Sequence, residues 1–339
     1  MKTPRFWYQS ASHPFAKYLN PFSKIVILAN RFRQKISQPK YFPIPIICCG
    51  NITVGGSGKT PIALEIAQIL KRNHFSPHFL TRGYGRKKKQ SHFKNLYISP
   101  TNPPSIDLKF FGDEALLLGR VAPCWIDSDR RKTALLASQM GADCLILDDG
   151  FQSPLLYKDL NLLLFNGQHA IGNTHILPAG PLREPLLDAI KRADYAIIVG
   201  EDRFKLSDRL KKSGLPTTHV SLAPSSTFLN QFLSEPVCAF AGIAFPEDFF
   251  KMLSQYGLKL VKTYVFSDHH IYTKSEVEKL LKIAKRFPLL TTEKDAMRFP
   301  EEIRKYFMIV KVKVIWHSAQ KRDEIFQILL KKYKARMSQ

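Results

Sequence analysis

The chain has 339 residues, of which 45% are hydrophobic and 23% charged; this balance excludes a disordered chain and predicts roughly two globular domains. Its formal net charge of +23 predicts a polyanionic partner, which is nucleic acid, an anionic membrane surface or a phosphorylated substrate. No apolar run approaches the roughly 18 residues of a spanning helix, no signal peptide is evident, and five cysteines lack metal-ligand spacing, so we expect a soluble or peripherally bound cytoplasmic protein with free thiols.

The first forty residues form a basic and aromatic segment. Residues 1–40 hold eight Lys and Arg side chains and no acidic ones, with Phe, Trp, Tyr, Ile and Leu interleaved. This mixture on one helix is typical of a helix that lies on a membrane surface, where each cation near anionic lipid contributes about 1 kcal/mol. It also fits a helix that packs on the protein with its charges solvated, so the segment alone leaves both interpretations open.

A glycine-rich loop after residue 50 predicts a nucleotide site. The apolar run at 41–51 indicates a buried strand, and apolar side chains recur at helical spacing over 60–73. Strand, glycine loop and helix make a P-loop, whose backbone N–H groups cradle phosphates while its lysine lies between the β- and γ-phosphates and its threonine hydroxyl ligates Mg²⁺. The predicted cradle is Thr53, Val54, Gly55, Gly56, Ser57, Gly58, Lys59 and Thr60.

Thr53 stands where the usual P-loop pattern has glycine. That position needs only a suitable backbone conformation, and the doubled glycine at 55–56 supplies local freedom, so we expect the loop to bind a nucleotide all the same. The alternative is a chance glycine-rich turn.

Two pairs of carboxylates are candidate partners of the P-loop. Asp148 and Asp149 follow the apolar run CLIL at the carboxyl end of a predicted strand, where open α/β sheets bind their ligands. An Asp-Gly turn is the alternative, but the P-loop upstream favours a metal role. Asp113 and Glu114 begin a predicted helix, where they also suit the helix dipole. The cation cluster at 81–89 either binds phosphates or is a solvated loop.

Seven stretches recur in a specific order over most of residues 40–300. They are GNITVGGSGKTP (50–61), TRGYGRK (81–87), GDEALLL (112–118), LDDGFQ (147–152), LPAGPLREP (177–185), SDHHIYT (267–273) and TTEKDAMRF (291–299). In this order they resemble tetraacyldisaccharide 4'-kinase, the family that phosphorylates the 4'-hydroxyl of a tetraacylated glucosamine disaccharide 1-phosphate in lipid A biosynthesis. The family carries a small hydroxyl residue at the position of Thr53. Ser153 and Ser128 depart from the family pattern, which has a histidine and an acidic residue there.

The resemblance implies a base and a supporting histidine. Asp113 matches the family's proposed catalytic base, which takes the proton from the 4'-hydroxyl. His269 matches a histidine that reaches across from a second domain to support this base, and Asp268 suits holding its imidazole in one tautomer. The neighbouring His270 is the alternative.

The resemblance also implies a site for ATP and Mg²⁺ and a substrate site. The P-loop Lys59 serves catalysis as well as binding, and the positions around Mg²⁺ are Thr60, Glu114, Asp148 and Asp149. Arg183, in the Pro- and Gly-rich loop, suits a sugar phosphate unless it pairs with Glu184, and Arg130 is a similar substrate candidate. Lys294 and Asp295 either contact the nucleotide or shape the cleft between domains.

Alternating strand-like and helix-like runs from 41 to about 200 predict a P-loop NTPase-like, doubly wound parallel sheet with a second, smaller α/β domain. The predicted divisions are a membrane-associating segment at 1–40, a P-loop kinase domain at 41–215 and a smaller domain at 216–339, whose last helix can fold back on the first. A Pro-, Ser- and Thr-rich stretch at 211–230 indicates a linker.

The resemblance therefore implies an ATP- and Mg²⁺-dependent kinase of tetraacyldisaccharide 1-phosphate, peripheral on the cytoplasmic face of the bacterial inner membrane. A substrate that lies in a bilayer favours the membrane interpretation of residues 1–40 and accounts for the positive charge without nucleic acid. No obligate protein partner is inferred. The alternative is a different P-loop ATPase or transferase, including one that binds nucleic acid, although the basic residues are spread along the chain rather than clustered.

Overall fold

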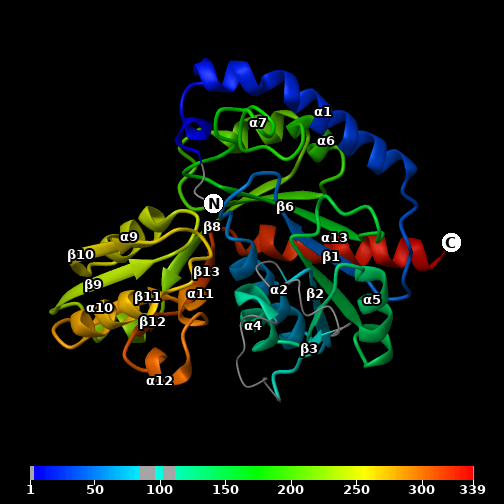
Figure 1. Cartoon of the computed structure of the whole chain (residues 1–339). Coiled ribbons are helices and arrows are strands. Elements are labelled where there is room, and N and C mark those ends of the chain that lie inside the picture. Colours follow the sequence, from blue (N-terminus) through cyan, green and yellow to red (C-terminus); the bar gives the residue numbers. More distant parts are fainter. Residues whose placement is uncertain (1–3, 84–95, 102–110, 339) are drawn as a thin grey trace.

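The computed structural model describes residues 4–83, 96–101 and 111–338, which form a large and a small α/β unit (Figure 1). Within these residues the large sheet has nine strands in the order β13-β8-β7-β6-β1-β5-β2-β4-β3. The strands are β1 (Ile46–Gly50), β2 (Pro77–Thr81), β3 (Leu96–Ile98), β4 (Cys124–Ile126), β5 (Cys144–Asp148), β6 (Leu160–Asn166), β7 (Tyr195–Val199), β8 (Thr217–Pro224) and β13 (Val312–Trp316). All neighbours pair in parallel except the two edge strands, β13 and β3.

Helices cover both faces of this sheet because successive side chains of its strands point to opposite faces and are buried on both. On one face pack α2 (Lys59–Arg72), α4 (Asp113–Gly119) and α13 (Ala319–Met337). On the other pack α1 (Pro14–Ile36), α5 (Arg130–Gln139), α6 (Leu186–Ile190) and α7 (Leu206–Lys212). Figure 1 shows α1 lying across α6 and α7 as the outermost layer. This is the doubly wound architecture that the sequence predicts.

The small unit is a parallel sheet of four strands in the order β10-β9-β11-β12. Its strands are β9 (Pro236–Ala241), β10 (Lys259–Val265), β11 (Leu289–Thr292) and β12 (Met308–Val310). Helix α9 (Pro246–Gln255) packs on one face, and α10 (Lys274–Ala284) and α12 (Glu301–Arg304) pack on the other. Short helices complete the chain at η1 (Arg5–Tyr8), α8 (Ser226–Asn230) and α11 (Glu293–Ala296).

The division between the units differs from the boundary predicted at 215/216. Strand β8 lies inside the stretch predicted as a linker, and it pairs with β7 of the large sheet. The chain leaves the large sheet after β8 and returns to it at β13 and α13, so the small unit is an insertion. Helix α13 is held there by Arg336, which bonds to Asp159 at 2.7 Å. The Pro and Ser residues of 211–230 gave the stretch a linker's composition, but its TTHV run is β-branched and fits a strand.

None of the described helices is both long and apolar enough to cross a membrane. Helix α1 nevertheless exposes a long apolar stripe. Its outward side chains are between 50% and 76% exposed, and they are Phe15, Tyr18, Phe22, Ile25, Leu28, Phe32 and Ile36. The opposite side of the helix packs on the large unit, where the buried Ser23 hydroxyl donates to the carbonyl of Ile176 at 2.6 Å. The stripe therefore faces away from the core that the helix covers.

Candidate active site

The glycine loop connects the end of β1 to the start of α2. Gly55 and Gly58 have φ angles of 115° and 74°, in the left-handed region that favours glycine. Thr53 instead forms an antiparallel bridge with Leu182: the N–H of Val54 donates to the carbonyl of Pro181 at 2.8 Å. Because residue 53 is extended, the backbone there makes no demand for glycine, and this explains the departure from the usual pattern.

Lys59, the first residue of α2, points to the carboxyl end of the sheet. Its Nζ lies 3.2 Å from Asn51 Oδ1 and 3.7 Å from Asp149 Oδ1. Asn51 also donates to the carbonyl of Thr53 at 2.8 Å, so it links the lysine to the loop. Asn51 was not among the predicted site residues, although it lies inside the GNITVGGSGKTP stretch. Thr60 follows at the start of the helix, half-buried.

Asp148 and Asp149 lie at the end of β5, next to β1, and their surroundings differ. Asp148 is buried, and burial together with the charge of Asp149 raises its pKa to about 6, although Lys59 acts in the opposite direction. Asp149 has φ 50° and both its carboxylate oxygens lie 3.1 Å from Arg183 Nη1. Partial burial would raise the pKa of Asp149, but Lys59 and Arg183 outweigh it and hold that pKa well below its usual range.

Arg183 and Arg130, both predicted to contact substrate, lie in different surroundings. Arg183 is partly exposed beside Asp149 and reaches Gln152 Oε1 at 3.3 Å. Arg130 is only 1% exposed, and its Nη2 donates to the main-chain carbonyl of Asp148 at 2.7 Å. Placed in this way, Arg130 supports the turn that carries the two aspartates and is not open to a substrate. Neither the charge of Arg130 nor its position in the DSDRRKT stretch predicts that it is buried.

The second half of the site joins the two units. Asp113, in the first turn of α4 on the large unit, has its Oδ2 3.2 Å from Nδ1 of His269 and 2.6 Å from Nη2 of Arg298, both from the small unit. Its neighbour Glu114 has Oε1 2.7 Å from Nζ of Lys294 and 3.7 Å from Nε2 of His269. Two carboxylates of one unit thus meet three basic side chains of the other.

The protonation of this cluster follows from burial and charge. Burial alone would raise the pKa of Asp113, but the hydrogen bond from His269 and the charges of Lys294 and Arg298 hold that pKa well below its usual range. Burial raises the pKa of Glu114, and the adjacent Asp113 adds to that effect while Lys294 opposes it. The charge of Lys294 also acts on Asp148, which connects this cluster electrostatically with the P-loop half of the site.

The two histidines of SDHH have separate positions. His269 has φ 55° and enters the carboxylate cluster, with Asp268 Oδ1 3.8 Å from its Nε2. His270 turns to the small unit, where it lies 3.0 Å from Glu276 Oε2 and stacks on Phe266. Of the two histidines, His269 is therefore the one that contacts the carboxylates of the large unit.

Several buried oxygens at this site have no hydrogen-bond partner among the described residues. They include Ser57 Oγ in the loop, Asp148 Oδ1 and Glu114 Oε2. Hard oxygen ligands of this kind suit Mg²⁺, and buried hydroxyls at a P-loop suit a phosphate. Residues Asp113, Glu114 and His269 also lie close enough together to hold an ion, but Arg298 and Lys294 already neutralise the two carboxylates. Asp148 is thus the carboxylate best suited to bind a metal directly.

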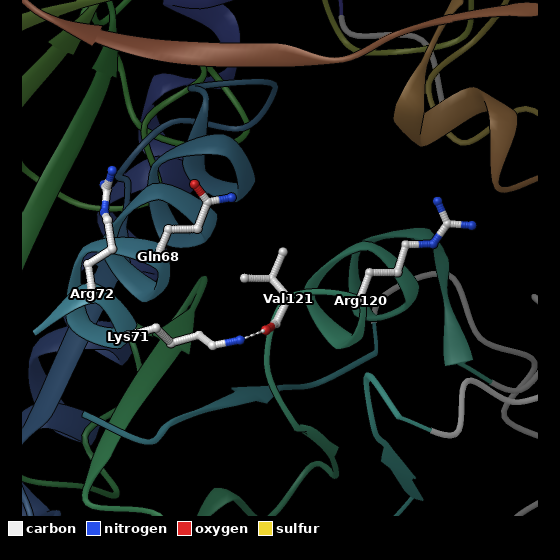
Figure 2. Close-up of a pocket in the computed structure, with 5 residues that line it drawn as sticks. All are labelled: Gln68, Lys71, Arg72, Arg120 and Val121. Carbon is white, nitrogen blue, oxygen red and sulfur yellow. Dashed lines mark hydrogen bonds between the residues drawn. The ribbon is translucent and has the colours of Figure 1, made fainter. Parts of the chain in front are cut away.

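All of the predicted site residues lie in the described ranges, but most of the cation cluster at 81–89 does not. Of residues 81–89, those from 84 on lie outside the described residues. A separate cavity of about 370 Å³ opens between the far ends of α2 and α4, where Lys71 donates to the carbonyl of Val121 at 3.0 Å (Figure 2). It lies at the opposite end of α2 from Lys59, so it is not part of this site.

Comparisons with known proteins give matches over almost the whole chain. A family model described as tetraacyldisaccharide-1-P 4'-kinase matches residues 15–333. The tetraacyldisaccharide 4'-kinase of Gluconobacter oxydans is 37% identical over 331 residues, which cover 97% of this chain and 98% of that protein. The protein of the same name from Gluconacetobacter diazotrophicus is 38% identical over 334 residues, covering 98% and 99%. A crystal structure described as the "apo" form of LpxK from Aquifex aeolicus in complex with ATP superposes with a TM-score of 0.72 at 28% identity, covering 93% of this chain and 99% of that one.

Proposed function

The chain belongs to the tetraacyldisaccharide-1-P 4'-kinase family, which confirms the resemblance, and we propose that it transfers the γ-phosphate of ATP to the 4'-hydroxyl of tetraacyldisaccharide 1-phosphate at the site between its two units. It is a kinase, with the doubly wound fold of its structural relative. The observation that carries the assignment of the site is the meeting of Asp113 with His269 across the units, at 3.2 Å.

ATP is the proposed phosphate donor. The P-loop with two left-handed glycines, the lysine beside Asp149 and the buried hydroxyl of Ser57 support this, as does the ATP named in the description of the Aquifex structure. Mg²⁺ is the proposed metal, held by Asp148 and Thr60, with Asp149 and Glu114 as the further predicted positions. When bound, it would neutralise charge on the β- and γ-phosphates.

Asp113 is the proposed base. Its low pKa keeps it ionised, so it can accept the 4'-hydroxyl proton as the O–P bond forms. In a loose phosphoryl-transfer transition state the hydroxyl loses its proton late, so orientation matters more than basicity. His269 holds the carboxylate and stabilises the changing charge, while Lys59 neutralises the transferring phosphoryl group. Arg183 is the proposed substrate contact, and the carbonyl of that residue accepts from Asn30 of α1 at 2.8 Å.

We further propose that α1 docks on an anionic membrane, at the cytoplasmic face of the inner membrane. The outward apolar stripe of α1 and its basic neighbours support a helix that lies in the interface plane. The same helix contacts the loop that carries Arg183, so docking would bring the substrate site to the bilayer surface.

A kinase assay tests the proposal. The protein is incubated with labelled ATP, Mg²⁺ and the disaccharide 1-phosphate in detergent micelles, and the 4'-phosphate product is measured. We expect transfer by the native protein and a loss of about 10²–10⁴ in kcat for Asp113→Asn. Absence of transfer combined with DNA-stimulated ATP hydrolysis would instead favour the nucleic-acid-binding ATPase.

A further inference from the structure

Arg298 is a buried arginine whose contacts do more than neutralise Asp113. It follows α11 in the small unit, and its side chain is only 7% exposed. Its guanidinium bridges the two units, because one edge contacts Asp113 of the large unit and another contacts groups of the small unit.

The small unit fixes the position of Arg298 rigidly. Nη1 donates to the carbonyl of Gly242 at 2.7 Å and to Asp295 Oδ1 at 2.8 Å. Asp295 is fully buried, and its carboxylate also accepts hydrogen bonds from three other groups: the N–H of Gly242 and the hydroxyls of Tyr272 and Thr292. Its own main-chain N–H donates back to Thr292 Oγ1 and closes the turn. A carboxylate held in this way cannot rotate without losing several hydrogen bonds, so it aims the arginine in one direction.

The rest of the guanidinium is directed at a single oxygen of Asp113. Nε lies 3.1 Å and Nη2 2.6 Å from Oδ2, the oxygen that also lies 3.2 Å from Nδ1 of His269. The other oxygen, Oδ1, accepts the main-chain N–H of Glu114 at 3.1 Å, and both hydrogen bonds from Arg298 to this carboxylate go to Oδ2. The two oxygens of Asp113 therefore have different surroundings: Oδ2 is held by Arg298 and His269, and Oδ1 is not bound by the arginine.

We propose that Arg298 is a positioning residue that locks Oδ2 of Asp113 and so presents Oδ1 as the atom that takes the proton of the acceptor hydroxyl. This rests on the proposed role of Asp113 as the base. The O–H bond of the hydroxyl breaks and its proton passes to Oδ1. The oxygen lone pair forms the new bond to the γ-phosphorus of ATP, while the bond from that phosphorus to the β,γ-bridging oxygen breaks and ADP leaves. Arg298 touches neither substrate nor nucleotide; it acts through Asp113. It also makes the orientation of the base depend on the approach of the small unit.

A merely structural tie between the units is the competing explanation, and a double-mutant cycle separates the two. We would measure kcat, KM for ATP and thermal unfolding for Arg298→Gln, Arg298→Lys, Asp113→Asn and the double variant Asp113→Asn/Arg298→Gln. Arg304→Gln is the matched control, since Arg304 is also buried in the small unit but donates to the carbonyl of Phe299 and not to Asp113.

Positioning predicts that Arg298→Gln lowers kcat by about 10²-fold, with KM for ATP little changed, and that Arg298→Lys recovers part of the loss. It also predicts that Arg298→Gln lowers kcat no further in the Asp113→Asn background, because the base on which it acts is gone. Arg304→Gln should retain the native kcat.

Independent, multiplying losses in the double variant would overturn the inference, as would a native kcat in Arg298→Gln. If Asp113→Asn itself retains the native kcat, the proposed base is wrong and the inference falls with it. That outcome is distinct from a cycle in which Asp113→Asn is impaired and Arg298→Gln is not.

Discussion

Asp148 and Asp149 are adjacent in the chain and have carboxylates of opposite character. Asp148 is buried with an unpartnered Oδ1 and a raised pKa, while Asp149 lies between Lys59 and Arg183 with a lowered one. Near neutral pH the charge of Asp148 therefore destabilises the ligand-free protein, while the charge of Asp149 stabilises it. The two residues make a matched pair for experiment.

The pH dependence of stability should reveal this difference. The folded protein binds the Asp148 proton more tightly than the unfolded chain does, because the pKa rises from 3.8 to about 6. Stability from this group is therefore present at low pH and is lost as the pH rises through about 6. Asp148→Asn should be more stable than the native protein at pH 8 by roughly 1–3 kcal/mol, and the gain should shrink toward acid pH. Thermal unfolding without nucleotide measures it.

Asp149→Asn should have the opposite effect. The pKa of Asp149 is lowered, so its stabilising contribution is present above the ordinary pKa of 3.8 and is lost as the pH falls further. The variant should unfold at a lower temperature than the native protein at pH 8. Equal shifts of the same sign in both variants would contradict the assigned surroundings.

Thr53 and Gly58 should respond differently to substitution. Thr53 is extended, so Thr53→Gly should leave KM for ATP nearly unchanged and cost only about 0.5–1 kcal/mol of stability through chain entropy. Gly58 has a φ of 74°, and the Cβ that alanine would add there would lie only 3.1 Å from Val199 Cγ1. Gly58→Ala should therefore strain the loop by about 1–3 kcal/mol and weaken nucleotide binding. Calorimetric titration with ATP measures both. Weaker binding in Thr53→Gly than in Gly58→Ala would show that the conformational argument is mistaken.

The two histidines make another matched pair. His269→Ala should lower kcat by about 10²–10⁴, because the variant removes the group that holds Oδ2 of Asp113 on one side. His270→Ala removes a contact with Glu276 inside the small unit and should affect stability more than kcat. Steady-state kinetics at saturating ATP decide the question, and normal turnover in His269→Ala would reject the proposed support of the base.

The apolar stripe of α1 predicts membrane binding. Replacing Phe15, Phe22 and Phe32 by Ser should strongly weaken sedimentation with anionic vesicles, since each buried Phe contributes roughly 1.5–3 kcal/mol. Transfer to substrate in detergent micelles should persist, because these side chains do not pack on the core. Ile271→Ser, which removes an exposed apolar side chain of the small unit, is the control. Undiminished vesicle binding by the triple variant would exclude α1 as the docking surface.

The P-loop and the aspartate pair were predictable from the sequence because each depends on a short local pattern beside a strand. The cluster around Asp113 was predictable only through resemblance, since its partners lie more than 150 positions away in the chain. Arg298 was missed because nothing in TTEKDAMRF indicates that its arginine crosses to the other unit. Arg130 was assigned to the substrate because burial of an arginine depends on tertiary packing that charge patterns do not reveal.

The insertion of the small unit between β8 and β13 determines how that unit can move. Strand β12 ends at Val310 and β13 begins at Val312, so one side of the connection is a single residue long. The other side runs through α8 and is longer. A unit that is joined by one short and one longer connection can rotate about the short connection but cannot slide freely. Lys311 is therefore the residue about which we expect any rotation between the two units to occur.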